Sequence, residues 1–242
     1  KRDLELFDTI IPLAALVGAP LCKMKPFEAR SINLDLISNI IKKLSSKQKI
    51  IFPTTNSGYG STSGDLKCDE NTPLNPVSLY GVLKKEAENL IMQRENSICF
   101  RLATVFGVSP RHRIDLLVND FVYKAYNDNC LVLFEEEFKR NYIHLDDVAE
   151  GFIFAEKNFK KMRGEIYNLG LSNANLSKKE LAILIKKYVK KLTIISSQVG
   201  TDPDKRNYIV DNSKIEKFGF KAKTSVEEGI KELIKYYSYI CK

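Results

Sequence analysis

The chain has 242 residues, of which 44% are apolar, and a formal net charge of +8 at neutral pH. This length and apolar content are typical of a folded globular protein with a buried core. The apolar run 9–21 is interrupted by two prolines and a glycine, so neither a membrane span nor a secretory signal is expected. Five scattered cysteines without a CxxC pair favour a reducing compartment, and we expect a cytoplasmic protein.

The positive charge does not by itself predict a nucleic-acid partner. In 177–192 the apolar residues Leu181, Ile185 and Leu192 recur at helical spacing, and lysines lie beside and between them. This pattern favours a solvated helix face over a site for a polyanion. We therefore expect no nucleic acid among the partners. Two histidines and dispersed cysteines also make a zinc site unexpected.

Predicted strands and helices alternate in the first half of the chain. Strands are predicted at 9–14, 49–53 and 97–101, and helices at 29–44 and 76–94. This order is typical of a parallel sheet with helices on its faces. Catalytic groups in such sheets follow the carboxyl ends of the strands, so 54–60 and 103–107 are candidate site segments.

The second half of the chain is less regular. Helices are predicted at 114–126, 145–158, 177–192 and 225–239, and strands at 130–134, 165–169, 193–196 and 208–211. Ser177 and Glu180 have the spacing of a capping box, in which each side chain satisfies a backbone donor at the start of a helix. A polar loop is predicted at 201–207.

Tyr80 and Lys84 are the first residues that suggest chemistry. A spacing of four inside the predicted helix 76–94 places them on one helix face. A nearby ammonium favours phenolate, so Lys84 is expected to lower the pKa of Tyr80 toward neutrality. The pair alone is weak evidence, because a lysine-rich helix often contains this spacing by chance.

The segments around the pair carry five ordered motifs. They are Leu13-Ala14-Ala15, the run from Thr54 to Tyr59-Gly60, Pro76-Val77-Ser78-Leu79-Tyr80-Gly81-Val82-Leu83-Lys84, the run from Arg101 to Gly107, and the run from Arg140 to Val148. Together they resemble the extended short-chain dehydrogenase/reductase family, in its NAD-dependent nucleotide-sugar epimerase/dehydratase branch. Two departures are Pro12, where a histidine is usual, and Thr104, where an asparagine is usual.

The resemblance implies an α/β fold with a Rossmann-like, doubly wound parallel sheet and a smaller α+β substrate-binding domain. The cofactor and catalytic domain would comprise 1–107 and 141–170. The nucleotide-sugar domain would comprise 108–140 and 171–242. NAD is the implied cofactor, with NADP as the alternative, and a homodimer is the implied assembly.

The glycine-rich loop of such a fold is not in the sequence. It normally follows the first strand, because glycines let the backbone approach the pyrophosphate at a helix N-terminus. Each βαβ unit takes roughly thirty residues, so about sixty residues would precede Lys1. We expect that the chain as printed omits this N-terminal βαβαβ part. The alternative is a remnant that binds dinucleotide poorly.

Residue roles follow from the resemblance. Tyr80 would be the acid/base, Lys84 would hold the nicotinamide ribose, and Thr55 would hydrogen-bond the reacting sugar oxygen. The implied cofactor-binding residues are Leu13, Ala14, Ala15, Asn33, Tyr80 and Lys84, and the implied substrate-binding residues are Asn56, Thr104, Arg140 and Arg206. Arginine suits the diphosphate, since its guanidinium matches phosphate in geometry and charge.

The two residues after Thr55 separate the branches of the family. Dehydratases of the family have Asp-Glu there, whereas this sequence has Asn56 and Ser57, neither of which titrates. A nucleotide-sugar epimerase that works through a transient ketone is therefore the first expectation. The alternatives are a ketoreductase, a dehydratase, and a noncatalytic relative that binds a nucleotide-diphosphate sugar.

Overall fold

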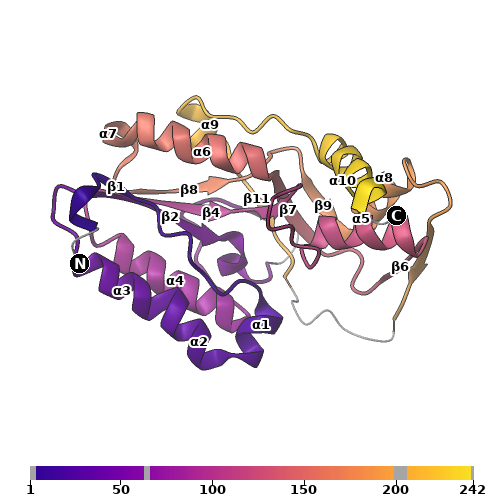
Figure 1. The fold of residues 1–242 in the computed structure, drawn as a ribbon, viewed down its shortest axis with the longest axis horizontal. Helices are drawn as coiled ribbons and strands as arrows, with labels where there is room; N and C mark the ends of the chain where they lie inside the picture. Colours follow the sequence, from indigo (N-terminus) through magenta and orange to yellow (C-terminus); the bar gives the residue numbers. More distant parts are fainter. Residues whose placement is uncertain (1–3, 63–65, 199–205, 241–242) are drawn as a thin grey trace.

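The structure is a computed structural model that describes residues 4–62, 66–198 and 206–240. Its centre is a parallel sheet with the order β1-β2-β4-β8 (Figure 1). The strands are β1 (Thr9–Ile10), β2 (Lys49–Thr55), β4 (Ser97–Leu102) and β8 (Glu165–Leu169). The register pairs Thr55 with Leu102, so β2 and β4 end at the same edge of the sheet. The predicted parallel α/β sheet is confirmed.

Different helices cover the two faces of this sheet (Figure 1). One face carries α1 (Ala19–Met24), α2 (Pro26–Arg30), a π-helical turn (Ser31–Asp35), α3 (Leu36–Ile41) and α4 (Leu79–Ile91). The other carries α6 (Leu145–Lys157) and α7 (Phe159–Met162), with α9 (Ser213–Lys217) nearby. The side chains of β2 alternate accordingly, since Ile50 and Phe52 pack in the core beneath α4 and Ile51 packs in the core beneath α6.

The remaining strands form small sheets that extend from the carboxyl edge of the central sheet (Figure 1). The strands β5 (Thr104–Phe106), β7 (Lys139–His144) and β9 (Asn175–Ser177) form one of them. The pairs are β6 (Cys130–Leu133) with β10 (Thr193–Ser196), and β3 (Lys67–Cys68) with β11 (Ile209–Val210). The helices are α5 (Leu117–Asn127), α8 (Lys178–Lys186) and α10 (Val226–Ile240), and two 3-10 turns occupy Leu4–Leu6 and Asn56–Tyr59.

Several predicted boundaries are wrong for local reasons. The strand predicted at 9–14 ends at Ile10, because Pro12 has no N–H to donate to a ladder, and 11–17 is irregular. The helix predicted from residue 29 begins at Pro26, a residue suited to the first helical position. The capping box of Ser177 and Glu180 is confirmed.

The expected helix pattern of 177–192 and the expected division into two domains have different outcomes. The amphipathic pattern of α8 is confirmed for Leu181 and Ile185, which are buried, and for Lys186, which is exposed. It is wrong for Lys178, which is 4% exposed and donates a hydrogen bond to the Phe134 carbonyl (2.9 Å). The division into two domains stays a prediction. Among the helices built from the described residues, none combines the length and apolar character needed to cross a bilayer. The predicted loop 201–207 lies mostly outside the described residues.

Candidate active site

A cavity of about 630 Å³ opens at the carboxyl ends of β2 and β4. This is the edge at which parallel α/β sheets place their ligands. The sequence-predicted residues on its wall are Leu13, Ala15, Thr55, Tyr80, Lys84, Thr104, Arg140 and Arg206. Ala14, Asn33 and Asn56 do not line it. The fold therefore brings most of the predicted site together from segments that are far apart in the sequence.

Thr55 ends β2 and caps the 3-10 turn Asn56–Tyr59. Its Oγ1 accepts a hydrogen bond from the backbone N of Ser57 (3.1 Å) and lies 2.8 Å from Ser57 Oγ. Arg206 Nη1 donates to the same Ser57 hydroxyl. Ser57 thus links the predicted catalytic threonine to a predicted substrate arginine. The sequence indicated only that this residue does not titrate, and its linking role depends on a contact with a residue 149 positions away.

Tyr80 lies in the first turn of α4, which Ser78 caps by accepting a hydrogen bond from the backbone N of Gly81 (3.2 Å). Burial raises the pKa of Tyr80 to about 12, while the positive charges of Arg206 and Arg113 and a hydrogen bond with Thr55 act to lower it. The expectation that Lys84 would bring this pKa toward neutrality is not met in this structure.

Lys84 lies one helical turn after Tyr80 in α4, and its side chain contacts the end of β2. The Lys84 side chain is only 4% exposed. Its Nζ donates a hydrogen bond to the carbonyl oxygen of Pro53 (2.9 Å) and lies 4.5 Å from the centre of the Phe52 ring. Burial lowers the pKa of Lys84 to about 8. The ammonium is therefore held by the end of β2 as well as facing the cavity.

The Asn33 side chain contacts the backbone of the irregular segment 11–17, which contributes to the cavity wall. Its Oδ1 accepts from the backbone N of Leu16 (2.9 Å), and its Nδ2 donates to the Leu16 carbonyl (2.9 Å). These two bonds tie the segment that carries Leu13 and Ala15 to the helical side of the sheet. Asn33 thus supports the cavity wall from behind, which is why it lies outside the cavity itself.

Asn56 is buried at 1% exposure, and neither polar atom of its side chain has a hydrogen-bond partner among the described residues. An unpartnered buried amide is unusual in a native structure. Because Asn56 does not line the cavity, its predicted contact with substrate stays a prediction.

Three arginines contribute to the cavity wall. Arg140 comes from β7 and is buried, and Arg206 precedes β11. Arg113, to which the sequence assigned no role, is held by Asp115, whose Oδ1 accepts from Arg113 Nε (3.0 Å). Such a concentration of guanidinium groups in a cavity suits a phosphorylated ligand.

Comparisons with known proteins agree with this geometry. The model of the NAD dependent epimerase/dehydratase family matches residues 3–170. The chain is 26% identical to dTDP-D-glucose 4,6-dehydratase of Mus musculus over 250 residues, covering 97% of this chain and 69% of that protein. It is 27% identical to an uncharacterized UDP-glucose epimerase, YtcB, of Bacillus subtilis over 248 residues, covering 97% of this chain and 76% of that protein.

Solved structures share the fold. UDP-glucuronic acid 4-epimerase from Bacillus cereus, in complex with UDP-glucuronic acid and NAD, has a TM-score of 0.82 at 23% identity, with 99% of this chain and 78% of that chain covered. UDP-glucose 4-epimerase from Thermotoga maritima, with UDP-glucose, has a TM-score of 0.84 at 23% identity, with 100% of this chain and 81% of that chain covered.

Proposed function

Because the chain belongs to the NAD-dependent epimerase/dehydratase family, we propose that it is an NAD-dependent epimerase of nucleotide-diphosphate sugars. The observation that carries the proposal is the meeting of Thr55, Tyr80 and Lys84 at one cavity, with the non-titrating Asn56 and Ser57 directly after the threonine.

The cavity wall suits the nicotinamide end of a dinucleotide. Leu13 and Ala15 supply an apolar surface, and the Lys84 ammonium supplies a donor that a ribose hydroxyl could accept from. Asn33 holds the segment that carries the apolar residues. NAD bound there would supply a reversible hydride acceptor beside the sugar.

The proton chemistry belongs to Tyr80 and Thr55. Thr55 orients the sugar hydroxyl by hydrogen bonding, and the Tyr80 oxygen takes the proton of that hydroxyl as the carbon becomes a ketone. Burial raises the pKa of Tyr80, and the positive charges of Arg206 and Arg113 act against this rise, in favour of the phenolate that accepts the proton. The same oxygen returns the proton after the ketone has turned its other face. Arg140 and Arg206 hold the diphosphate.

A dehydratase is the second candidate, since a relative with that name matches almost the whole chain. Loss of water from neighbouring carbons needs a general acid and a general base beside the ketone. Asn56 and Ser57 provide neither. This difference favours epimerisation, with simple ketone reduction as a further alternative.

Product analysis distinguishes these reactions. The purified protein is incubated with NAD and separately with UDP-, GDP-, CDP- and dTDP-sugars, and the products are identified by NMR. We expect an epimer to form without net accumulation of NADH. A 4-keto-6-deoxy sugar would contradict the proposal in favour of a dehydratase, and binding of sugar nucleotide without turnover would favour a noncatalytic relative.

Tyr80→Phe removes the hydroxyl and keeps the ring. We expect turnover to fall by at least about 100-fold, the usual contribution of a positioned acid/base. The affinity for the sugar nucleotide, measured by calorimetry, should change little. Tyr239→Phe, at an exposed position in α10, is the matched control. Unchanged turnover in Tyr80→Phe would remove this residue from the mechanism.

We also propose a homodimer, formed through the helices beside α4. Met24 in α1 and Phe27 in α2 are large, exposed apolar residues on that side of the molecule. The cytoplasmic location stays a prediction. It is consistent with Cys22, Cys68, Cys99 and Cys130, which are all free thiols.

A further inference from the structure

A buried ion pair lies behind the cavity wall, between α4 and β4. The Arg101 guanidinium faces the Glu88 carboxylate, with Nη2 to Oε1 at 2.8 Å and Nε to each carboxylate oxygen at 3.2 Å. Both side chains are almost completely buried. Neither residue lines the cavity, and neither has a role in the reaction proposed above.

Glu88 connects the ion pair both to helix α4, which carries Tyr80, and to the end of β2, which carries Thr55. Tyr80, Lys84 and Glu88 follow one another at intervals of four, so they share one face of α4. The Glu88 Oε2 also accepts a hydrogen bond from the hydroxyl of Thr54 (2.8 Å), the residue directly before Thr55. The carboxylate therefore ties the helix of Tyr80 to the strand end of Thr55.

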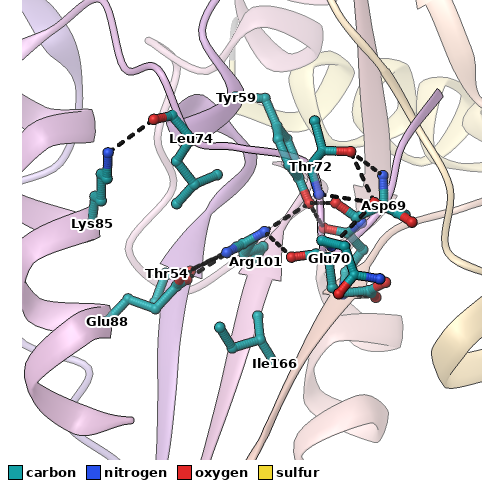
Figure 2. A network of polar contacts seen from close by, with 12 residues as sticks. Thr54, Tyr59, Asp69, Glu70, Thr72, Leu74, Lys85, Glu88, Arg101 and Ile166 are labelled. Carbon is teal, nitrogen blue, oxygen red and sulfur yellow. Dashed lines mark hydrogen bonds and ion pairs between the residues drawn. The ribbon is translucent and has the colours of Figure 1, made fainter. Parts of the chain in front are cut away.

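Arg101 extends the same contacts to the turn that follows Thr55. Figure 2 shows its guanidinium between Glu88 and Tyr59. Nη1 donates to the Tyr59 hydroxyl (3.1 Å) and to the Glu70 carbonyl (3.1 Å). The Tyr59 hydroxyl in turn donates to Asn168 Oδ1 (2.7 Å). The turn Asn56–Tyr59 is thus fixed at its far end by Arg101 and at its near end through Thr54.

We propose that Glu88 and Arg101 are positioning residues, which hold Thr55 at the correct separation from Tyr80. This inference rests on the proposed function. Catalysis depends on such placement, since a shift of about 1 Å between reacting groups can reduce the rate by as much as 100-fold. Neither residue touches the substrate, so the effect is on turnover rather than on binding.

A purely structural ion pair is the competing explanation. Removing one member of a buried pair destabilises a protein whether or not a site depends on it. Glu88→Gln alone therefore does not decide the matter. Thr54→Val is the sharper test, because it removes one hydrogen bond to Glu88, leaves the ion pair intact and changes a cavity-wall side chain that is only 4% exposed. Thr54→Ser restores the hydroxyl.

We expect Thr54→Val to lower kcat by about 10-fold or more with KM changed less than about two-fold. Thr54→Ser should recover most of this loss. Glu88→Gln should lower kcat at least as much at a temperature where denaturation curves show it fully folded. The matched control is Glu156→Gln, since Glu156 likewise accepts from a threonine hydroxyl, that of Thr9 (3.0 Å), and from a lysine, Lys49 (2.9 Å), away from the cavity. Its kcat should be unchanged.

A second readout does not need turnover. In protein labelled with 3-fluorotyrosine, the ¹⁹F line of Tyr80 is assigned by its loss in Tyr80→Phe. We expect this line to move in Thr54→Val and Glu88→Gln and to stay in place in Thr54→Ser and Glu156→Gln. A stationary line together with an unchanged kcat in Thr54→Val overturns the inference. If the wild-type protein turns over no sugar nucleotide, the proposed function fails, and the ¹⁹F comparison alone decides the positioning role.

Discussion

Lys84 shows how a single residue connects stability to the proposed chemistry. Its ammonium is held charged in a buried place by one carbonyl and one aromatic ring, and burial lowers its pKa to about 8. In the unfolded chain the pKa of a lysine is about 10.4. The cavity therefore contains a cation whose presence opposes folding at neutral pH, as is common where function rather than stability determines a residue.

The lowered pKa of Lys84 should make the free energy of unfolding depend on pH. Between pH 8 and pH 10.4 the unfolded state holds more protons at Lys84 than the native state does, so the contribution of Lys84 to the free energy of unfolding rises with pH. We expect the difference between wild type and Lys84→Met to increase by about 2 kcal/mol in favour of wild type from pH 7.5 to pH 9.5.

Urea denaturation at several pH values measures that difference. Subtracting the two proteins removes the titration of the groups that Lys84 does not influence. Lys85→Met controls for the loss of a hydrogen bond from lysine to a carbonyl, since Lys85 Nζ donates to Leu74 O (2.9 Å). A difference that stays constant with pH would contradict the lowered pKa of Lys84.

For single residues, the sequence predicted which side chains lie at the cavity better than it predicted the contacts that hold them there. The spacing of Tyr80 and Lys84 placed both at the cavity, because a helix fixes which residues share a face. It did not predict that Lys84 donates to Pro53, that Asn33 acts through Leu16, or that Arg113 reaches the wall. Those contacts depend on how distant segments pack, which no local pattern encodes.

Helix α4 is the element on which the proposed chemistry depends most directly, because its first turn contains Tyr80. Ser78 caps that turn through its bond to Gly81 N. Ser78→Ala should lower the free energy of unfolding by about 1 kcal/mol, the usual effect of losing an N-cap. Since the frayed turn contains Tyr80, the proposed acid/base, kcat should fall as well.

Ser177→Ala in α8 is the comparison for this variant. It removes the cap and one half of a capping box, so its stability loss should be at least as large in urea denaturation. Its helix carries no residue of the cavity wall, and kcat should be unaffected. An equal loss of kcat in both variants would indicate a general effect of stability.

The elements themselves were predicted unevenly. The strands β2 and β4 are buried on both faces and therefore read as continuous apolar runs. The strand β7 was missed, because it buries polar residues, among them Arg140 and Asn141, and shows no apolar run. A strand that carries polar residues to a cavity wall lacks the apolar run by which buried strands are recognised in a sequence.

The central parallel sheet followed from the alternation of strands and helices in the first half of the chain, and the Rossmann-like fold followed from the family resemblance. The assembly of the molecule did not, and the proposed dimer needs its own test. Phe27 is 85% exposed, which is unusual for a phenylalanine, and it lies next to helices that pack on α4. If this side is the interface between two copies, Phe27→Glu should produce monomers.

Sedimentation velocity across a range of protein concentrations measures this change. Ile183→Glu places the same charge on an exposed apolar position of α8, remote from α4, and should leave the assembly unchanged. A wild-type protein that sediments as a monomer at all concentrations would contradict the proposed dimer.

The contact between Arg206 and Ser57 has a consequence for ligand affinity. A free arginine side chain loses about 0.5–1.5 kcal/mol of conformational entropy when a ligand immobilises it. Arg206 is already bonded to the turn after Thr55, so much of that loss is incurred during folding. Under the proposed function, a diphosphate arriving at this wall would meet a pre-organised anion site and exchange one hydrogen-bond partner for another.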